Sequence, residues 1–217
     1  MPEYLQHNRI RLALHTLRPG SGRSLLLLHG LGERSPDRVP NELSSWPGPV
    51  QALDFTGHGT SSVPKAGGYT SELLMADADA ALARLGEATL VGRGLGAYVA
   101  LLLAGGRPKQ VRGAILRDGP GLAGGGSTST SSFIPFVDPQ ALPPPDPFAL
   151  VELAIDIRPP DYACIFARQA VQFSKLSHPV SVCALERPDW LQAVVAELGV
   201  EVSTLRAALD RYARDEA

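Results

Sequence analysis

The chain has 217 residues, of which 44% are hydrophobic and 19% are charged, and its formal net charge is −2. This length is enough to bury one full hydrophobic core, and the composition excludes an intrinsically disordered chain. The charge is scattered without a basic block, which argues against a nucleic-acid-binding protein because nothing would neutralise the phosphates.

The first residues lack the apolar segment of a secretory signal peptide. The longest apolar run, at 97–104, is far too short to span a bilayer. The two cysteines, Cys164 and Cys183, form no C-x-x-C pair and no metal-ligand spacing. We therefore expect a cytoplasmic protein that does not enter membranes and that holds neither a metal ion nor a cofactor.

The first predicted elements are strands. Residues 3–17 alternate between polar and apolar side chains, which predicts a strand pair. After a Gly/Pro turn at 19–22, continuous apolar runs at 24–28 and 50–54 predict strands that are covered on both faces. Thr70 or Ser71 then caps a predicted helix that runs to residue 85 and stops at Gly86.

Strands and helices alternate through the rest of the chain. Strands are predicted at 89–91, 111–117, 180–184 and 200–202, and helices at 95–104 and from about residue 203 onward. This order predicts a single α/β domain over residues 1–217, with a mostly parallel sheet of about seven or eight strands and helices on both faces. The last helix carries an apolar stripe that could face its own sheet or a second copy, so a homo-oligomer stays open.

Residues 119–147 interrupt this pattern. They contain three successive glycines at 124–126, a Ser/Thr run and three successive prolines at 143–145. We interpret them as a short irregular lid, with a disordered insertion as the alternative. The helical stretches 148–155 and 162–173 would complete this cap, so the predicted lid insertion covers about residues 119–176.

Four short motifs follow four of the predicted strands in chain order. They are HGLG at 29–32, DFTGHGTS at 54–61, GRGLG at 92–96 and DGP at 118–120. Each motif alone is a weak signal, but their order and intervals resemble the α/β-hydrolase superfamily over almost the whole chain. The resemblance implies an α/β-hydrolase-like fold in which GRGLG forms the nucleophile elbow.

Two departures from the family pattern concern the reacting groups. Gly94 stands where the family has its nucleophile serine, and residues 190–217 contain no histidine where the family has its base. The resemblance also implies an oxyanion hole built from the backbone N–H groups of Leu31 and Leu95. A serine hydrolase needs both a hydroxyl and an imidazole, so we expect a degenerate active site that performs no Ser-His-Asp hydrolysis.

The leading functional prediction is a protein that binds a small carbonyl or carboxylate ligand, or that serves as an interaction scaffold. Since Gly94 has no side chain, we expect extra room above the elbow. The candidate pocket residues are His29, Gly30, Gly32, Arg93, Asp118, Glu186 and Asp189.

Two alternatives stay open. Asp118, His29 and His58 are weak candidates for hydrolase or lyase chemistry with a non-standard residue set. In addition, Gly92-x-Gly94-x-x-Ala97 follows a strand and precedes a helix, which matches a dinucleotide-binding fingerprint with Asp118 at the end of the next strand. The dinucleotide interpretation leaves the HGLG and DFTGHGTS turns unexplained.

Overall fold

The computed structural model describes residues 1–65, 67–128 and 144–214. Within them, eight strands form one sheet in the order β1-β2-β4-β3-β5-β6-β7-β8. β1 (Glu3–His7), β2 (Ile10–Arg18) and β4 (Val50–Asp54) pair antiparallel in that order. The other strands are parallel: β3 (Ser24–Leu28), β5 (Ala88–Arg93), β6 (Val111–Arg117), β7 (Val180–Val182) and β8 (Val200–Val202). The predicted mostly parallel α/β sheet is confirmed.

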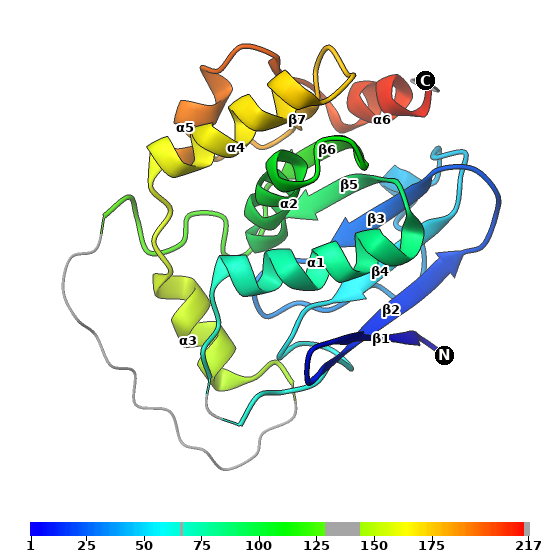
Figure 1. The fold of residues 1–217 in the computed structure, drawn as a ribbon, viewed down its shortest axis with the longest axis vertical. Coiled ribbons are helices and arrows are strands. Elements are labelled where there is room, and N and C mark those ends of the chain that lie inside the picture. The colour runs from blue at the N-terminus through cyan, green and yellow to red at the C-terminus, as the bar shows by residue number, and fades with distance from the viewer. Residues whose placement is uncertain (66, 129–143, 215–217) are drawn as a thin grey trace.

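Helices cover both faces of the sheet, as Figure 1 shows. One face carries α1 (Ser71–Leu85), α2 (Leu95–Gly106), α4 (Pro160–Phe173) and α5 (Asp189–Val195). The other carries the short 3₁₀-helix η1 (Asn41–Leu43) and α6 (Leu205–Arg214). In β3, Leu26 and Leu28 face the first layer whereas Leu25 and Leu27 face the second. Two covered faces explain why the strand is an unbroken apolar run.

Local signals set most element ends. The Thr70 hydroxyl accepts a hydrogen bond from the Leu73 N–H at the start of α1, and Gly86 ends that helix at φ 81°. α2 continues through Gly105 and Gly106, beyond its predicted end, and β7 is shorter than predicted. α5 was not predicted. No helix within 1–65, 67–128 and 144–214 is long and apolar enough to cross a membrane.

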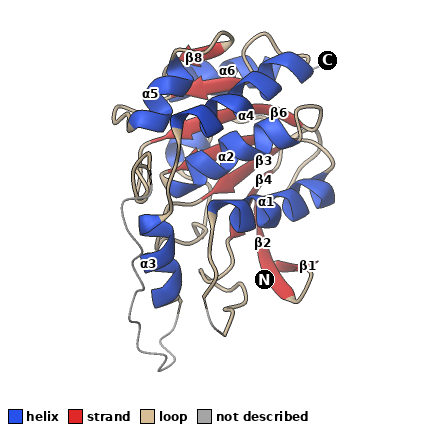
Figure 2. Cartoon of the chain, turned by 60° about the vertical axis from the view of Figure 1, so that its left-hand side comes forward, coloured by secondary structure: helices blue, strands red, loops and turns tan. Residues whose placement is uncertain are grey.

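The predicted cap is wrong in its second half. Figure 2 shows α3 (Pro147–Ile155) set apart from the helical layer, whereas α4 lies within that layer. The buried face of α4 includes Ala163 and Ala167, and a Cβ on Gly105 of α2 would lie 2.5 Å from the Phe166 carbonyl oxygen. These small residues bring α4 close to α2, so it belongs to the core. The Ser/Thr run and first prolines of the predicted lid fall mostly at 129–143, outside the described residues.

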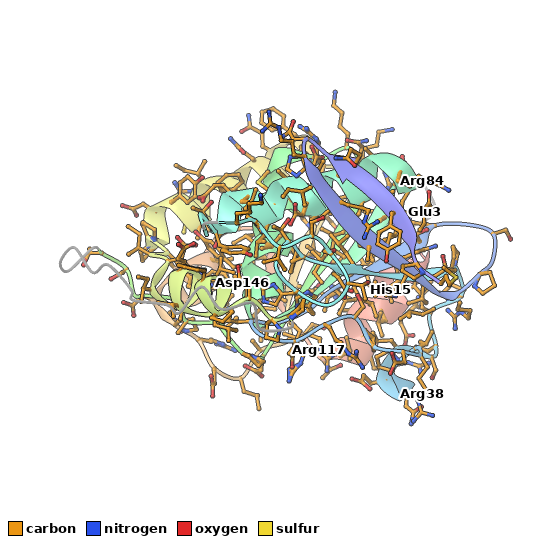
Figure 3. The ribbon with its side chains drawn as sticks, turned by 90° about the horizontal axis from the view of Figure 1, so that it is seen from below. Glu3, His15, Arg38, Arg84, Arg117 and Asp146 are labelled. Atoms are coloured by element: carbon orange, nitrogen blue, oxygen red, sulfur yellow. The ribbon has the colours of Figure 1, made fainter. Side chains whose placement is uncertain are left out.

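Carboxylates fasten α3 to Tyr69 in the loop before α1 and to Ser71 at the start of α1. The Tyr69 hydroxyl donates to Asp146, the N-cap residue of α3, over 2.6 Å. Glu152 accepts from the Tyr69 N–H over 2.6 Å, and Asp156 accepts from the Ser71 N–H over 3.0 Å. Asp146 is labelled in Figure 3. These hydrogen bonds fix α3 beside the carboxyl ends of the central strands.

Candidate functional site

The turn between β5 and α2 has the backbone shape expected of a nucleophile elbow. Gly94 adopts φ 58° and ψ −120°, a conformation that residues with a Cβ rarely adopt. A Cβ on Gly96 would lie 2.3 Å from the Leu28 carbonyl oxygen, and one on Gly92 would lie 2.2 Å from the Gly96 carbonyl oxygen. The glycines therefore let α2 start directly against the end of the sheet.

The space above this turn is filled by the chain itself. The Leu31 N–H donates to the Pro120 carbonyl oxygen over 3.0 Å, and the Leu95 N–H donates to the same oxygen over 2.9 Å. An ideal Cβ on Gly94 would lie 2.1 Å from that oxygen and 2.6 Å from the Gly119 carbonyl carbon. The expectation of extra room above Gly94 was wrong, because the segment after β6 folds back over the elbow. The two N–H groups that the resemblance assigns to an oxyanion hold an internal carbonyl.

Asp118 follows β6 and joins it to the loop after β7. One carboxylate oxygen accepts from the Leu185 N–H over 2.8 Å, and the other accepts from the Glu186 N–H over 2.9 Å. Both oxygens are thus bound to backbone groups rather than to an imidazole. Glu186 enters this clamp through its backbone.

The dinucleotide alternative finds no support in this geometry. A pyrophosphate at the elbow would need the Leu95 N–H, which already holds the Pro120 oxygen. The Asp118 carboxylate, which would bind a ribose, already holds two backbone N–H groups.

His29 and His58 hold loops together. The Phe55 N–H donates to Nε2 of His29 over 3.1 Å, so Nδ1 carries the proton and donates to the Gly30 carbonyl oxygen over 2.7 Å. In His58, Nε2 accepts from the Gly32 N–H over 3.2 Å and Nδ1 contacts the Thr56 carbonyl oxygen at 3.1 Å. Every ring nitrogen is engaged, so neither imidazole has a free lone pair for proton abstraction.

Burial also keeps both imidazoles neutral. Burial, and then the neighbouring His58, lower the pKa of His29 to about 3, against a smaller opposite effect of the Gly30 carbonyl. Burial is likewise the main cause that lowers the pKa of His58. A general base at neutral pH needs a pKa near 7, so this direction also speaks against a catalytic role.

Asp54, at the end of β4, holds the turn that contains His58. Its carboxylate accepts from the N–H groups of Ser35 and Thr60 over 2.8 Å each, and contacts Nε2 of His15 at 2.9 Å. His15 is labelled in Figure 3. Burial alone would raise the pKa of the Asp54 carboxyl, but these hydrogen bonds together bring the pKa below its usual value. The buried Asp54 carboxylate therefore holds this turn in its shape through hydrogen bonds.

The connection between β8 and α6 contains no histidine. β8 ends at Val202 and α6 begins at Leu205, so only Ser203 and Thr204 connect them. In the described part of the chain, no group of three His, Cys, Asp or Glu side chains is placed to hold a metal ion.

A cavity of about 430 Å³, which we call the strand-end cavity, opens at the carboxyl ends of β3, β5 and β6, on the face that carries η1 and α6. Leucine and valine side chains of β3, β5 and η1 form its floor. Charged residues of the loop after β3 and of the strand ends form its rim. Its lining residues are Leu27, Leu28, His29, Glu33, Arg34, Ser35, Pro36, Asp37, Pro40, Glu42, Leu43, Val91, Arg93 and Arg117.

The predicted pocket residues do not gather in one place. His29 and Arg93 line the strand-end cavity, whereas Gly30 and Gly32 shape the turn beside it. Asp189 begins α5 and lines a different cavity of about 200 Å³ together with Arg158.

Sequence reasoning missed Arg117 as a pocket residue. A signal for it was present, because Arg117 and Arg93 both end predicted parallel strands and such ends meet at one edge of the sheet.

Comparisons with known proteins support the fold. No protein-family model matches this chain, and no curated protein matches it by sequence. The thioesterase domain of the curacin biosynthetic pathway matches with a TM-score of 0.68 at 17% identity, covering 98% of this chain and 96% of that one. Est1E from Butyrivibrio proteoclasticus, solved with bound ferulic acid, matches with a TM-score of 0.65 at 16% identity, covering 97% and 96%.

Some other matches are partial. An epoxide hydrolase from Vigna radiata matches at 27% identity with a TM-score of 0.48, over 54% of this chain and 37% of that chain. The matched part of this chain therefore covers well under half of that enzyme. The full-length matches and the eight-stranded sheet of the described residues together show that the chain has the α/β-hydrolase fold.

Proposed function

We propose that this chain is a ligand-binding protein on the α/β-hydrolase fold and does not hydrolyse esters through a serine-type mechanism. One observation carries the proposal: the N–H groups of Leu31 and Leu95 are both engaged by the carbonyl oxygen of Pro120. The elbow is thereby closed by the protein's own backbone at the point where a substrate carbonyl would bind.

Acyl transfer needs a nucleophile, a base and free oxyanion donors. Gly94 provides no hydroxyl, and the two residues between β8 and α6 provide no imidazole. Freeing the donors would break two hydrogen bonds, each worth about 1 kcal/mol, and displace the Pro120 segment. Replacing a single residue would therefore not restore the missing chemistry.

The strand-end cavity is the ligand site of this proposal. Open α/β sheets bind ligands beyond the carboxyl ends of their strands, and pockets for small molecules measure about 300–1,000 Å³. The cavity lies at that edge, falls within that size range and combines an apolar floor with a charged rim. The ligand therefore binds beside the elbow rather than on it.

The catalytic part is tested with p-nitrophenyl esters and a fluorophosphonate probe on the wild-type chain, Gly94→Ser and Asp118→Asn. We expect no turnover above buffer and no labelling in any of them, with circular dichroism establishing that each variant is folded. Ester turnover that persists through purification of the wild type and drops in Asp118→Asn would overturn this part.

The ligand part is tested by titration calorimetry of the wild-type chain against a panel of small acids, amides, esters and alcohols. We expect saturable binding of at least one compound class. Absence of heat across the whole panel would refute a small-molecule site and leave the scaffold interpretation.

A further inference from the structure

Two arginines stand side by side in the wall of the strand-end cavity. Arg93 is the last residue of β5, Arg117 is the last residue of β6, and the two are register partners in this parallel pair. Neighbouring strands lie about 4.8 Å apart, and partner residues point to the same face of a sheet. Both side chains line the cavity. Two guanidinium groups thus reach one space from adjacent strands.

The present partners of these arginines leave hydrogen-bonding capacity free. Arg93 pairs with Glu33 at 3.2 Å and also donates to the Asp118 carbonyl oxygen over 3.2 Å. Arg117 reaches Oε1 of Glu42 only at 3.4 and 3.5 Å, the outer limit of a hydrogen bond. Glu42 belongs to η1, and its side chain is 49% exposed. A long contact to an exposed carboxylate contributes little and is easily replaced.

The charge on the rim favours a monoanion. The cavity is lined by three arginines and three carboxylates, of which Arg34 and Asp37 pair with each other on the exposed side. An incoming monocarboxylate adds one negative charge, which is offset when Glu42, whose side chain is 49% exposed, gives up its place on Arg117 and turns to solvent. A dianion adds two negative charges, one more than the displacement of Glu42 offsets.

The apolar floor of the cavity favours a ligand that has an apolar part besides its charged group. Leu27, Leu43 and Val91 contribute to it, and each of them is at least nine-tenths buried. The connection from β3 to β4 contains only the three-residue η1, so no long helix covers the edge at this point. Contact with these side chains would remove apolar ligand surface from water.

We propose that the ligand of this cavity is a small monocarboxylate with an apolar body, whose carboxylate is held between Arg93 and Arg117 in competition with Glu42. This inference rests on the proposed function, since it names the ligand class of the same cavity. A planar carboxylate matches the fork of the guanidinium group, which gives two directed hydrogen bonds where an ammonium group gives a point charge.

The experiment compares three probes: benzoate, its uncharged analogue benzamide, and inorganic phosphate. They are titrated into the wild-type protein and into Arg117→Gln, Arg93→Gln, Glu42→Gln and the control Arg84→Gln. Arg84 pairs with Glu3 away from the cavity, and both are labelled in Figure 3. Thermal midpoints establish that each variant is folded.

We expect benzoate to bind the wild type more tightly than benzamide or phosphate. Arg117→Gln and Arg93→Gln should each weaken benzoate binding by about tenfold, with Arg84→Gln unchanged. Glu42→Gln should strengthen benzoate binding severalfold, which a purely structural role of these residues would not produce.

The different failures are distinguishable. Equal binding of benzamide and benzoate, or tighter binding of phosphate, would overturn the carboxylate inference and leave a ligand site in place. If benzoate binding is unchanged in both arginine variants and in Glu42→Gln, the benzoate carboxylate binds elsewhere, and the carboxylate inference is likewise overturned. If neither these probes nor the wider panel bind, the proposed function itself fails.

Discussion

Replacing Gly94 with alanine adds one methyl group where the Pro120 segment covers the elbow. The new Cβ would lie 2.1 Å from the Pro120 carbonyl oxygen and 2.6 Å from the Gly119 carbonyl carbon. Both contacts are with backbone atoms, so a side-chain rotation cannot relieve them. The segment has to move, and the hydrogen bonds from the Leu31 and Leu95 N–H groups lengthen or break.

The expected loss of stability has two parts. An alanine at φ 58° costs roughly 1–2 kcal/mol. Two weakened backbone hydrogen bonds cost about 0.5–1.5 kcal/mol each. The free energy of unfolding should therefore fall by about 2–5 kcal/mol in Gly94→Ala.

Gly86→Ala is the matched control. Gly86 also has a positive φ, of 81°, but a Cβ there would meet nothing within 4 Å. This variant should lose only the backbone part, roughly 1–2 kcal/mol. Urea denaturation gives both values, and amide exchange at Leu31 and Leu95 should become faster only in Gly94→Ala. If Gly94→Ala loses no more stability than Gly86→Ala, the Pro120 carbonyl does not close the elbow.

Three further predictions follow from other parts of the molecule. Asp118→Asn weakens the clamp between β6 and the loop after β7, so urea denaturation should show a loss of about 1–3 kcal/mol, and an unchanged midpoint would contradict the clamp. The pKa of His29 lies near 3 in the folded protein and near 6.5 in the unfolded chain, so the unfolded state binds more protons between these values. The contribution of His29 to the free energy of unfolding is therefore complete above pH 6.5 and falls by about 1.4 kcal/mol per pH unit as the pH drops toward 3. Urea denaturation at pH 7, 6 and 5 should show this pH dependence in the wild type, and it should be weaker in His29→Gln. Tyr69→Phe removes the donor to Asp146, so limited proteolysis should cut near α3 faster than in the wild type, with global stability lower by about 1–2 kcal/mol; equal cleavage rates would exclude this fastening.

The sequence by itself determined the sheet. The bounds of β3, β4, β6 and β8 agree with the prediction. A short, continuous apolar run between turn residues is typical of a strand that is covered on both faces, so the run itself marks where the strand begins and ends. Capping residues similarly set the ends of α1, from Thr70 to Gly86. The glycine at position 94 of the elbow motif was also readable from the sequence, whereas α6 begins at Leu205, two residues later than predicted.

Only the tertiary structure decided what occupies the elbow and where a ligand fits. The Pro120 carbonyl that closes the elbow is a backbone group, and sequence patterns report side chains, so no periodicity could place it there. α4 joined the core rather than the cap because its alanines meet the glycine-rich end of α2. Arg93 and Arg117 became neighbours through strand register. These outcomes depend on contacts between residues far apart in sequence, whose geometry is set by packing of the whole molecule.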